Sequence, residues 1–235
     1  MLKYLFIILL KSLLVSAVVT FEPYERLDYS EMRQKLIELH MFYPETIKLS
    51  TASEEFGIHD DNICGYTKCE LDIVTITDRS VSSEQKVQVF ISGAFHGNER
   101  LGPRVSFYLI EYLASNFGKD DHITYLLQNR EIIITPMTNS YGFYHNFREQ
   151  RVTDHNSGYG TDVDPNRDFP YNNDSHLCMN TVVGQTVYRL FVENLFVSAI
   201  TFHGGTNVVA YNWGSNNHIV LGRRAAEAPD HIAVH

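Results

Sequence analysis

Apolar and polar positions along the chain follow two periods, one typical of helices and one typical of strands. After Ser30, apolar side chains share one broad face over residues 31–42, which predicts a helix that ends before Pro44. The same period predicts further helices over 99–114, 123–128 and 186–194. Short apolar runs predict strands over 47–50, 71–76, 86–92, 131–135 and 196–202.

The order of these elements indicates the fold class. Strands that alternate with helices are typical of an α/β domain. The run at 131–135 is too apolar for an edge strand, so we expect burial on both of its faces. We therefore predict a mixed, largely parallel central sheet with helices on both faces. Residues 139–180 are rich in Asn, Asp, Gly and Tyr, and so long an irregular segment in a compact domain is usually functional.

The N-terminus has the pattern of a signal peptide at residues 1–17. Lys3 precedes two apolar runs, each far shorter than a membrane span requires, and small residues follow. An uncleaved membrane anchor or a buried N-terminal helix are the alternatives, because Lys11 interrupts the apolar stretch. We expect residues 18–235 to form one domain, secreted or in the secretory lumen, without stable membrane insertion.

Composition and charge narrow the class of partner. Hydrophobic residues make up 44% and charged residues 20%, which is ordinary for a globular domain. The net charge is −9, and loss of residues 1–17 would remove lysines but no acids. This balance argues against nucleic acid as a partner, because phosphates require a basic surface.

Cysteine spacing fits a secreted chain in part. Cys64 and Cys69 flank Gly65 closely enough for a small disulfide loop. Cys178 is then left over, or pairs outside this sequence. Asn173 begins an acceptor motif for glycosylation.

Three side chains suggest a metal site. Two predicted strands end just before His96 and His203, and ligands bind beyond the carboxyl ends of such strands. Glu99 follows His96 by three residues, and Gly93 permits tight backbone geometry there. The His-x-x-Glu pattern alone is weak evidence, but a catalytic zinc commonly takes two His, one carboxylate and a water. We therefore predict one zinc ion held by His96, Glu99 and His203.

A turn-rich segment between these ligands carries further candidates. Asn166 and Arg167 are interpreted as a clamp for a carboxylate, since guanidinium binds carboxylate in a fork. Asp164 is expected to hold the far nitrogen of His96. The alternative is a solvated loop without a ligand.

These features, in this order, resemble the zinc carboxypeptidase family of the carboxypeptidase A/B type. His96, Glu99 and His203 match its zinc ligands, and the Asn166–Arg167 pair matches its binders of the substrate's terminal carboxylate. The stretch from His96 to Arg100 is similar to the regulatory branch. The resemblance covers roughly residues 25–220. It implies a monomeric zinc exopeptidase that acts on peptide or protein C-termini.

The family also uses an arginine upstream of the Asn-Arg pair to polarise the scissile carbonyl. Spacing favours Arg151 for this catalytic and substrate-binding role, with Arg148 as the alternative. The family's general-base Glu and pocket Tyr lie well after the third ligand, and Glu227 is too near His203 to serve as that base. We therefore expect the domain to be incomplete at its C-terminus and these residues alone to hydrolyse peptides weakly.

Two other functions remain open. An acyl-amino-acid deacylase of the aspartoacylase type also uses a His-Gly-Asn-Glu motif, a later Asn-Arg pair and a third His. The longer interval between Glu99 and Asn166 and the Phe202-His-Gly-Gly segment favour the carboxypeptidase. A peptide-binding module without catalysis is the non-enzymatic alternative, because the expected glutamate is not assigned.

Overall fold

The computed structural model describes residues 27–153, 160–170, 178–211, 219–220 and 224–225. The predicted signal peptide and the acceptor Asn173 lie outside these ranges. Within them, no helix combines the length and apolar character needed to cross a bilayer.

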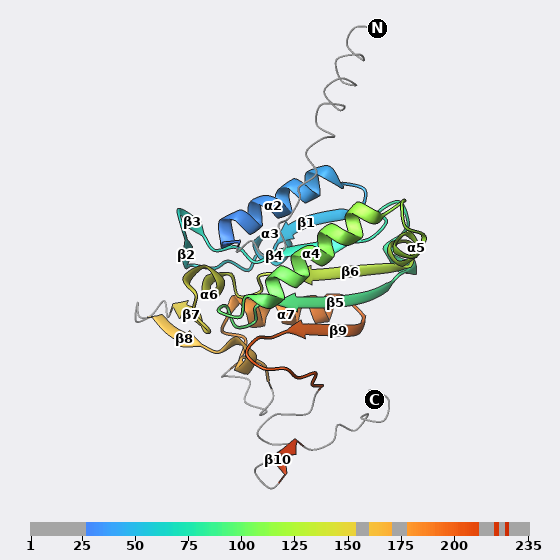
Figure 1. The fold of residues 1–235 in the computed structure, drawn as a ribbon. Helices are drawn as coiled ribbons and strands as arrows, with labels where there is room; N and C mark the ends of the chain where they lie inside the picture. Colours follow the sequence, from blue (N-terminus) through green and yellow to red (C-terminus); the bar gives the residue numbers. More distant parts are fainter. Residues whose placement is uncertain (1–26, 154–159, 171–177, 212–218, 221–223, 226–235) are drawn as a thin grey trace.

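A five-stranded mixed sheet forms the centre of the protein (Figure 1), in the order β1-β4-β6-β5-β9. Strand β5 pairs in parallel with β6 and β9, whereas β4 pairs antiparallel with β1 and β6. The prediction of a mixed sheet with parallel central strands is confirmed, and the apolar run at 131–135 lies inside the sheet. The strand bounds are β1 (Ile47–Thr51), β4 (Asp72–Ile76), β5 (Val87–Gly93), β6 (Arg130–Thr135) and β9 (Phe196–Phe202).

Helices cover both faces of this sheet (Figure 1), because successive strand side chains point to opposite sides. Ile91 and Ile134 pack in the core cluster beneath one group of helices, whereas Phe90 and Ile133 pack in a second cluster with the other. The first group is α2 (Tyr29–Phe42), α4 (Leu101–Asn116) and α5 (Asp121–Asn129), and the second is α3 (Ala52–Phe56) and α7 (Val182–Glu193).

Helix ends differ from the predicted ones where capping decides them. Asp28, not Ser30, caps α2, since its carboxylate accepts from the Glu31 amide at 2.8 Å in a capping box. Helix α7 begins four residues before Thr186, because the Thr181 hydroxyl accepts from the Gly184 amide at 2.8 Å. Both caps are local side-chain bonds that hydrophobic periodicity does not reveal.

The segment 139–180, predicted as irregular, contains short regular elements in its described part. A short helix is followed by an antiparallel strand pair and a 3₁₀ turn, and a second hairpin lies beside the helix. The elements of the segment are α6 (Ser140–His145), β7 (Gln150–Thr153), β8 (Gly160–Val163) and η2 (Pro165–Arg167). The hairpin beside α6 comes from earlier in the chain and consists of β2 (Ile63–Cys64) and β3 (Thr67–Lys68). A small strand pair, β10 (Ile219–Val220) and β11 (Arg224–Ala225), follows β9.

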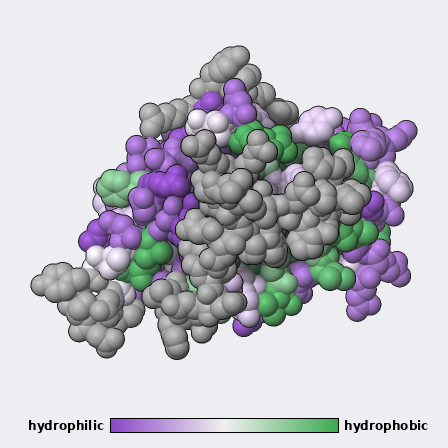
Figure 2. Space-filling view, turned by 90° about the horizontal axis from the view of Figure 1, so that it is seen from below, coloured by the Kyte–Doolittle hydropathy of each residue, from purple (hydrophilic) through white to green (hydrophobic). Residues whose placement is uncertain are grey.

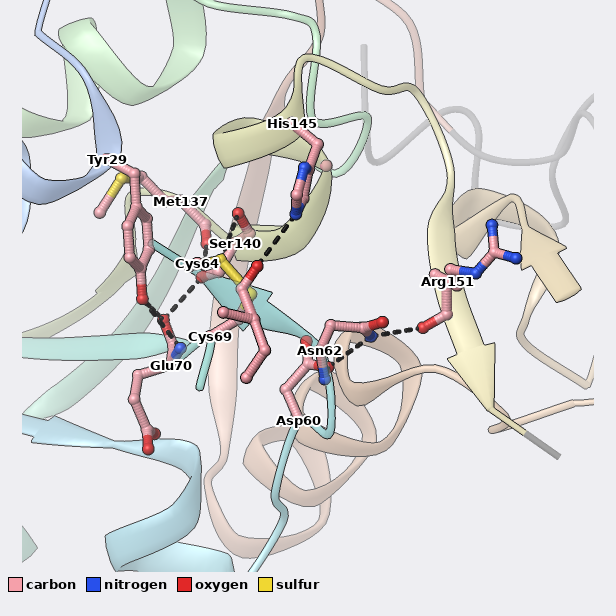
Figure 3. Close-up of a disulfide and its surroundings, with 12 residues drawn as sticks. Tyr29, Asp60, Asn62, Cys64, Cys69, Glu70, Met137, Ser140, His145 and Arg151 are labelled. Atoms are coloured by element: carbon pink, nitrogen blue, oxygen red, sulfur yellow. Dashed lines mark hydrogen bonds between the residues drawn. A yellow bond between two sulfur atoms is a disulfide. The ribbon is translucent and has the colours of Figure 1, made fainter. Parts of the chain in front are cut away.

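The predicted disulfide is confirmed and closes the β2–β3 hairpin (Figure 3). Both cysteines are buried, and the hairpin is hydrogen-bonded to a neighbouring segment: His145 contacts the Ile63 carbonyl at 2.9 Å.

We expect the double change Cys64→Ser, Cys69→Ser to lower the free energy of unfolding by about 2 kcal/mol, the loop-entropy value for so short a loop. Urea denaturation measures this loss. A Cys178→Ser variant, which retains the disulfide, is the control, and an unchanged midpoint in the double variant would contradict the expectation.

Strand β9 lies at an edge of the described sheet and exposes apolar side chains. Among the described strands β9 pairs with β5, and Val197 and Ile200 are 68% and 46% exposed. Helix α7 adds Phe191 and Val192 at 47% and 61% exposure. Figure 2 shows the face of the molecule that points downwards in Figure 1. Hydrophobic side chains lie among hydrophilic ones on that face.

Candidate metal and carboxylate site

Parallel pairing brings the predicted metal ligands to one edge of the sheet. Gly93 of β5 lies opposite Phe202 of β9, so the chain leaves both strands at the same level. His96 follows β5 by three residues and His203 follows β9 directly, while Glu99 lies in the turn before α4. Side chains 104 residues apart in the chain, those of Glu99 and His203, are thereby in contact.

Glycine is required where this turn approaches its neighbours. A Cβ atom on Gly97 would lie 2.0 Å from the backbone carbon of Gly142. A Cβ atom on Gly93 would lie 2.6 Å from the carbonyl oxygen of Pro136. Real Cβ atoms do not approach so closely, so side chains at these positions would push the ligand turn away from the sheet.

Glu99 lies between the two imidazoles. Its Oε1 is 2.9 Å from Nδ1 of His96, and its Oε2 is 2.9 Å from Nδ1 of His203. The Gly204 amide also donates to Oε2 at 2.9 Å. His96 is buried, whereas the side chain of His203 is 38% exposed, so the group is open to ligands on one side.

These three side chains fit one zinc ion. Their ligand atoms all lie within 4.8 Å of one another. Tetrahedral zinc with bonds of about 2.0–2.1 Å separates its donors by about 3.4 Å. The two imidazole–carboxylate contacts, at 2.9 Å, are shorter than this value, and no pair of ligand atoms is more than 4.8 Å apart. Two imidazoles with one carboxylate leave the fourth position for water.

Asp164 fixes the orientation of His96. Its Oδ1 contacts Nε2 of His96 at 3.1 Å and accepts from the Asn166 amide at 2.9 Å. With Nε2 held in this way, Nδ1 of His96 faces Glu99. The contact matches the geometry expected from the sequence.

Both carboxylates of the site are held as anions. Burial alone would raise the pKa of Glu99, but the Gly204 amide and the two imidazoles lower it below the ordinary value. Burial acts in the same direction on Asp164, and the Asn166 amide, His96 and Arg148 together lower its pKa. Anionic carboxylates are the form that binds metal and orients a ligating imidazole.

Arg148, rather than Arg151, lies at the ligand group. Its Nη1 is 3.5 Å from Oε1 of Glu99 and its Nη2 is 3.3 Å from Oδ2 of Asp164. Arg151 lies within β7 and pairs with Asp162 of β8 at 3.4 Å. The sequence spacing favoured Arg151, but the structure brings the other arginine to the candidate metal position.

The predicted carboxylate clamp forms an exposed turn beside the same group. Asn166 and Arg167 lie in η2, and Arg167 Nη1 donates to the Asn166 carbonyl at 2.9 Å. Both side chains are exposed, and the turn begins at Asp164. The clamp residues are therefore two and three positions from a carboxylate that contacts a candidate metal ligand.

The sequence reasoning missed Asp168, a buried acid that follows the clamp. It is 1% exposed and receives hydrogen bonds from Asn180 and Thr181. Its only signal in the sequence was its place among the acids of the segment 162–171.

Comparisons with known proteins point to one family. A family model described as zinc carboxypeptidase matches residues 65–234. Mouse carboxypeptidase D is 27% identical over 154 residues, which cover 63% of this chain and 11% of that protein. Mouse carboxypeptidase M is 29% identical over 125 residues, which cover 49% of this chain and 26% of that protein.

Solved structures show the same fold. Carboxypeptidase A from Helicoverpa armigera aligns with a TM-score of 0.69 at 17% identity, over 92% of this chain and 52% of that one. Thrombin-activatable fibrinolysis inhibitor aligns with a TM-score of 0.63 at 16% identity, over 83% of this chain and 53% of that one. The chain thus spans about half the length of these two structures and a smaller share of the curated relatives.

Proposed function

The chain belongs to the zinc carboxypeptidase family, and from this premise we propose that it contributes to a zinc-dependent exopeptidase that removes the C-terminal residue of peptides or proteins. The supporting observation is the convergence of His96, Glu99 and His203 at the ends of two parallel strands, with Arg167 on the neighbouring turn. We further propose a secretory destination, because the Cys64–Cys69 disulfide is a bond that persists in oxidising compartments.

His96, Glu99 and His203 would hold the zinc ion. When bound, zinc lowers the pKa of a coordinated water towards about 7 and acts as a Lewis acid. Asp164 keeps the His96 ring in its ligating orientation through the 3.1 Å contact to Nε2. The 38% exposure of His203 leaves that side of the group accessible to a peptide.

Arg148 is the residue we propose for polarising the scissile carbonyl. Its guanidinium lies against Glu99 and Asp164, yet its side chain is 41% exposed, so we expect it also to reach a substrate oxygen. A preorganised donor to a developing oxyanion is typically worth about 3 kcal/mol. Arg151 is instead paired with Asp162 on the neighbouring strand.

Asn166 and Arg167 would restrict cleavage to the end of the chain. A free terminal carboxylate can accept two parallel hydrogen bonds from a guanidinium, whereas a backbone amide within a peptide cannot. Both side chains are exposed and stand on a short turn fixed by Asp164, so their position relative to the metal ligands is constrained.

The general base is not assigned to a described residue. Glu99 is occupied as a metal ligand, and Asp164 is occupied by His96 and Arg148. For the described residues the proposal is therefore zinc-dependent binding of peptides, with no residue among them named as the base.

The test compares peptides that differ only in a free or amidated C-terminus. Zinc-loaded protein should bind N-acetylated dipeptides with a free carboxylate more tightly, and released amino acid should appear only from these. Equal binding of both forms would contradict the proposal. Cleavage of acyl-amino acids instead would favour the deacylase, and binding without any release would favour the peptide-binding module.

A matched pair of variants separates the two arginines. We expect Arg148→Lys to weaken binding of a phosphonate peptide analogue about 10- to 100-fold, because lysine keeps the charge but loses the planar fork facing the oxyanion. Arg151→Lys is the control and should change the affinity less than about threefold. Isothermal titration calorimetry with zinc-loaded protein measures both. The opposite ranking would assign the role to Arg151.

A further inference from the structure

The clamp turn and the segment with Arg148 share one anchor in the first turn of α7. Resting on the proposed function, we infer that buried Asp168 is a positioning residue that fixes Asn166 and Arg167 through this anchor.

Asp168 uses both carboxylate oxygens to hold the start of α7. Its Oδ2 accepts from the Thr181 amide and hydroxyl, both at 2.7 Å. Its Oδ1 accepts from the Asn180 amide at 3.0 Å and from the Asn180 side chain at 3.2 Å. The Met179 amide donates to the Asp168 carbonyl at 2.9 Å. Backbone and side chain of the residue after the clamp are thus both tied to the approach to α7.

The contact with α7 leaves no spare room. A Cβ atom added to Gly184 would lie 2.6 Å from Oδ2 of Asp168 and 3.2 Å from Oγ1 of Thr181. Thr181 is itself the N-cap of α7 and accepts from the Gly184 amide. The Thr181 hydroxyl therefore links the start of α7 to Asp168. A larger residue at position 184 would displace the Asp168 carboxylate.

The same turn also holds the segment that carries Arg148. The Val183 amide donates to Oε1 of Gln150 at 3.2 Å, and Nε2 of Gln150 donates to buried Asp60 at 3.0 Å. Gln150 is 2% exposed and lies two residues after Arg148. Figure 3 shows how Asn62, which donates to Asp60, also bonds the Arg151 carbonyl of β7. The clamp turn and the segment that follows Arg148 are therefore both hydrogen-bonded to the start of α7.

Carboxylate chemistry is needed at position 168. Four hydrogen atoms point at its two oxygens, two at each. In Asp168→Asn, one carboxylate oxygen becomes an NH2 group that cannot accept, so whichever way the amide is turned, the backbone amide of Asn180 or of Thr181 loses its acceptor. The clamp turn should then lose its fixed position while the metal ligands keep theirs.

The experiment measures carboxylate preference, defined as the ratio of Kd for an amidated N-acetyl dipeptide to Kd for its free-acid form. Dipeptides ending in Ala, Lys and Phe are titrated into the zinc-loaded chain. We expect a preference of about 10-fold or more in the wild type and less than about threefold in Asp168→Asn. Zinc affinity, measured by chelator competition, should fall by less than about 10-fold because the three ligands are retained, whereas a general loss of structure would abolish zinc binding.

A second variant tests the same contact in case Asp168→Asn does not fold. Gly184→Ala keeps the Asp168 charge and favours the helix, yet its Cβ displaces the carboxylate, so it should lower the preference as well. Asp162→Asn, an exposed acid on β8, is the matched control and should retain the wild-type ratio. If Asp168→Asn and Gly184→Ala both keep the wild-type ratio, the inference about Asp168 is wrong while the proposed function stands. A wild type without any preference would overturn the clamp itself and this inference with it.

Discussion

Replacing Glu99 with glutamine is expected to lower the zinc affinity of the protein by more than about 100-fold. The loss of a residue that only orients a ligand costs about 10- to 100-fold, and Glu99 is proposed as a ligand itself. Its two oxygens face the two Nδ1 atoms at 2.9 Å, and a glutamine would turn an amide group towards one of these sites. Competition with a chromophoric zinc chelator measures the affinity.

The matched control is Glu193→Gln, an exposed acid paired with Arg189 at the far end of α7. It should leave zinc affinity within about twofold of the wild type, because exposed ion pairs contribute little and this one lies away from the site. Wild-type affinity in Glu99→Gln would show that the metal is held elsewhere.

Replacing Arg33 with methionine is expected to lower the free energy of unfolding by about 3–5 kcal/mol at pH 8. Arg33 Nε donates to both oxygens of Asp72 at 3.1 and 3.0 Å, and Asp72 is 2% exposed. Methionine retains much of the apolar volume but leaves the buried carboxylate without its cation. Urea denaturation of metal-free protein measures the loss.

The loss should depend on pH. Burial raises the pKa of Asp72 to about 6, although Arg33 opposes the rise. The folded state therefore binds more protons than the unfolded state between about pH 4 and pH 6, and this group's contribution to stability falls as pH rises through that window. Without Arg33 the pKa rises further, so the variant should be closer to wild type at pH 4.5 than at pH 8.

The control for Arg33→Met is Lys48→Met, whose partner Glu55 is partly exposed. This surface pair should contribute less than about 1 kcal/mol. An equal loss in the two variants would contradict the view that burial makes the Arg33–Asp72 pair important.

Much of the sheet could be predicted because its strands are apolar runs bounded by polar residues. The run at 131–135 predicted an interior strand, and β6 lies between β4 and β5. The short strands β7 and β8 could not be predicted in this way. Their burial pattern is largely partial or exposed, so no alternation of apolar residues distinguishes them from a loop.

The grouping of His96, Glu99 and His203 could be anticipated because parallel strands deliver their carboxyl ends to one edge. Which of Arg148 and Arg151 lies beside these ligands could not. Arg148 precedes β7 and reaches the ligand group, whereas Arg151 lies within the strand and faces Asp162. That difference depends on where a polar strand begins, which neither spacing nor hydropathy specifies. Asp168 was missed because its partners, Asn180 and Thr181, are distant in sequence.

The outer edge of β9 affects how this polypeptide would behave at high concentration. Among the described residues no further strand pairs with this edge, so its backbone groups, flanked by Val197 and Ile200, offer a template on which another chain can add a strand. Purified material would then show light scattering that grows with protein concentration. A lysine placed at Val197 should suppress this scattering and leave zinc binding intact, because charge on an edge disfavours intermolecular pairing.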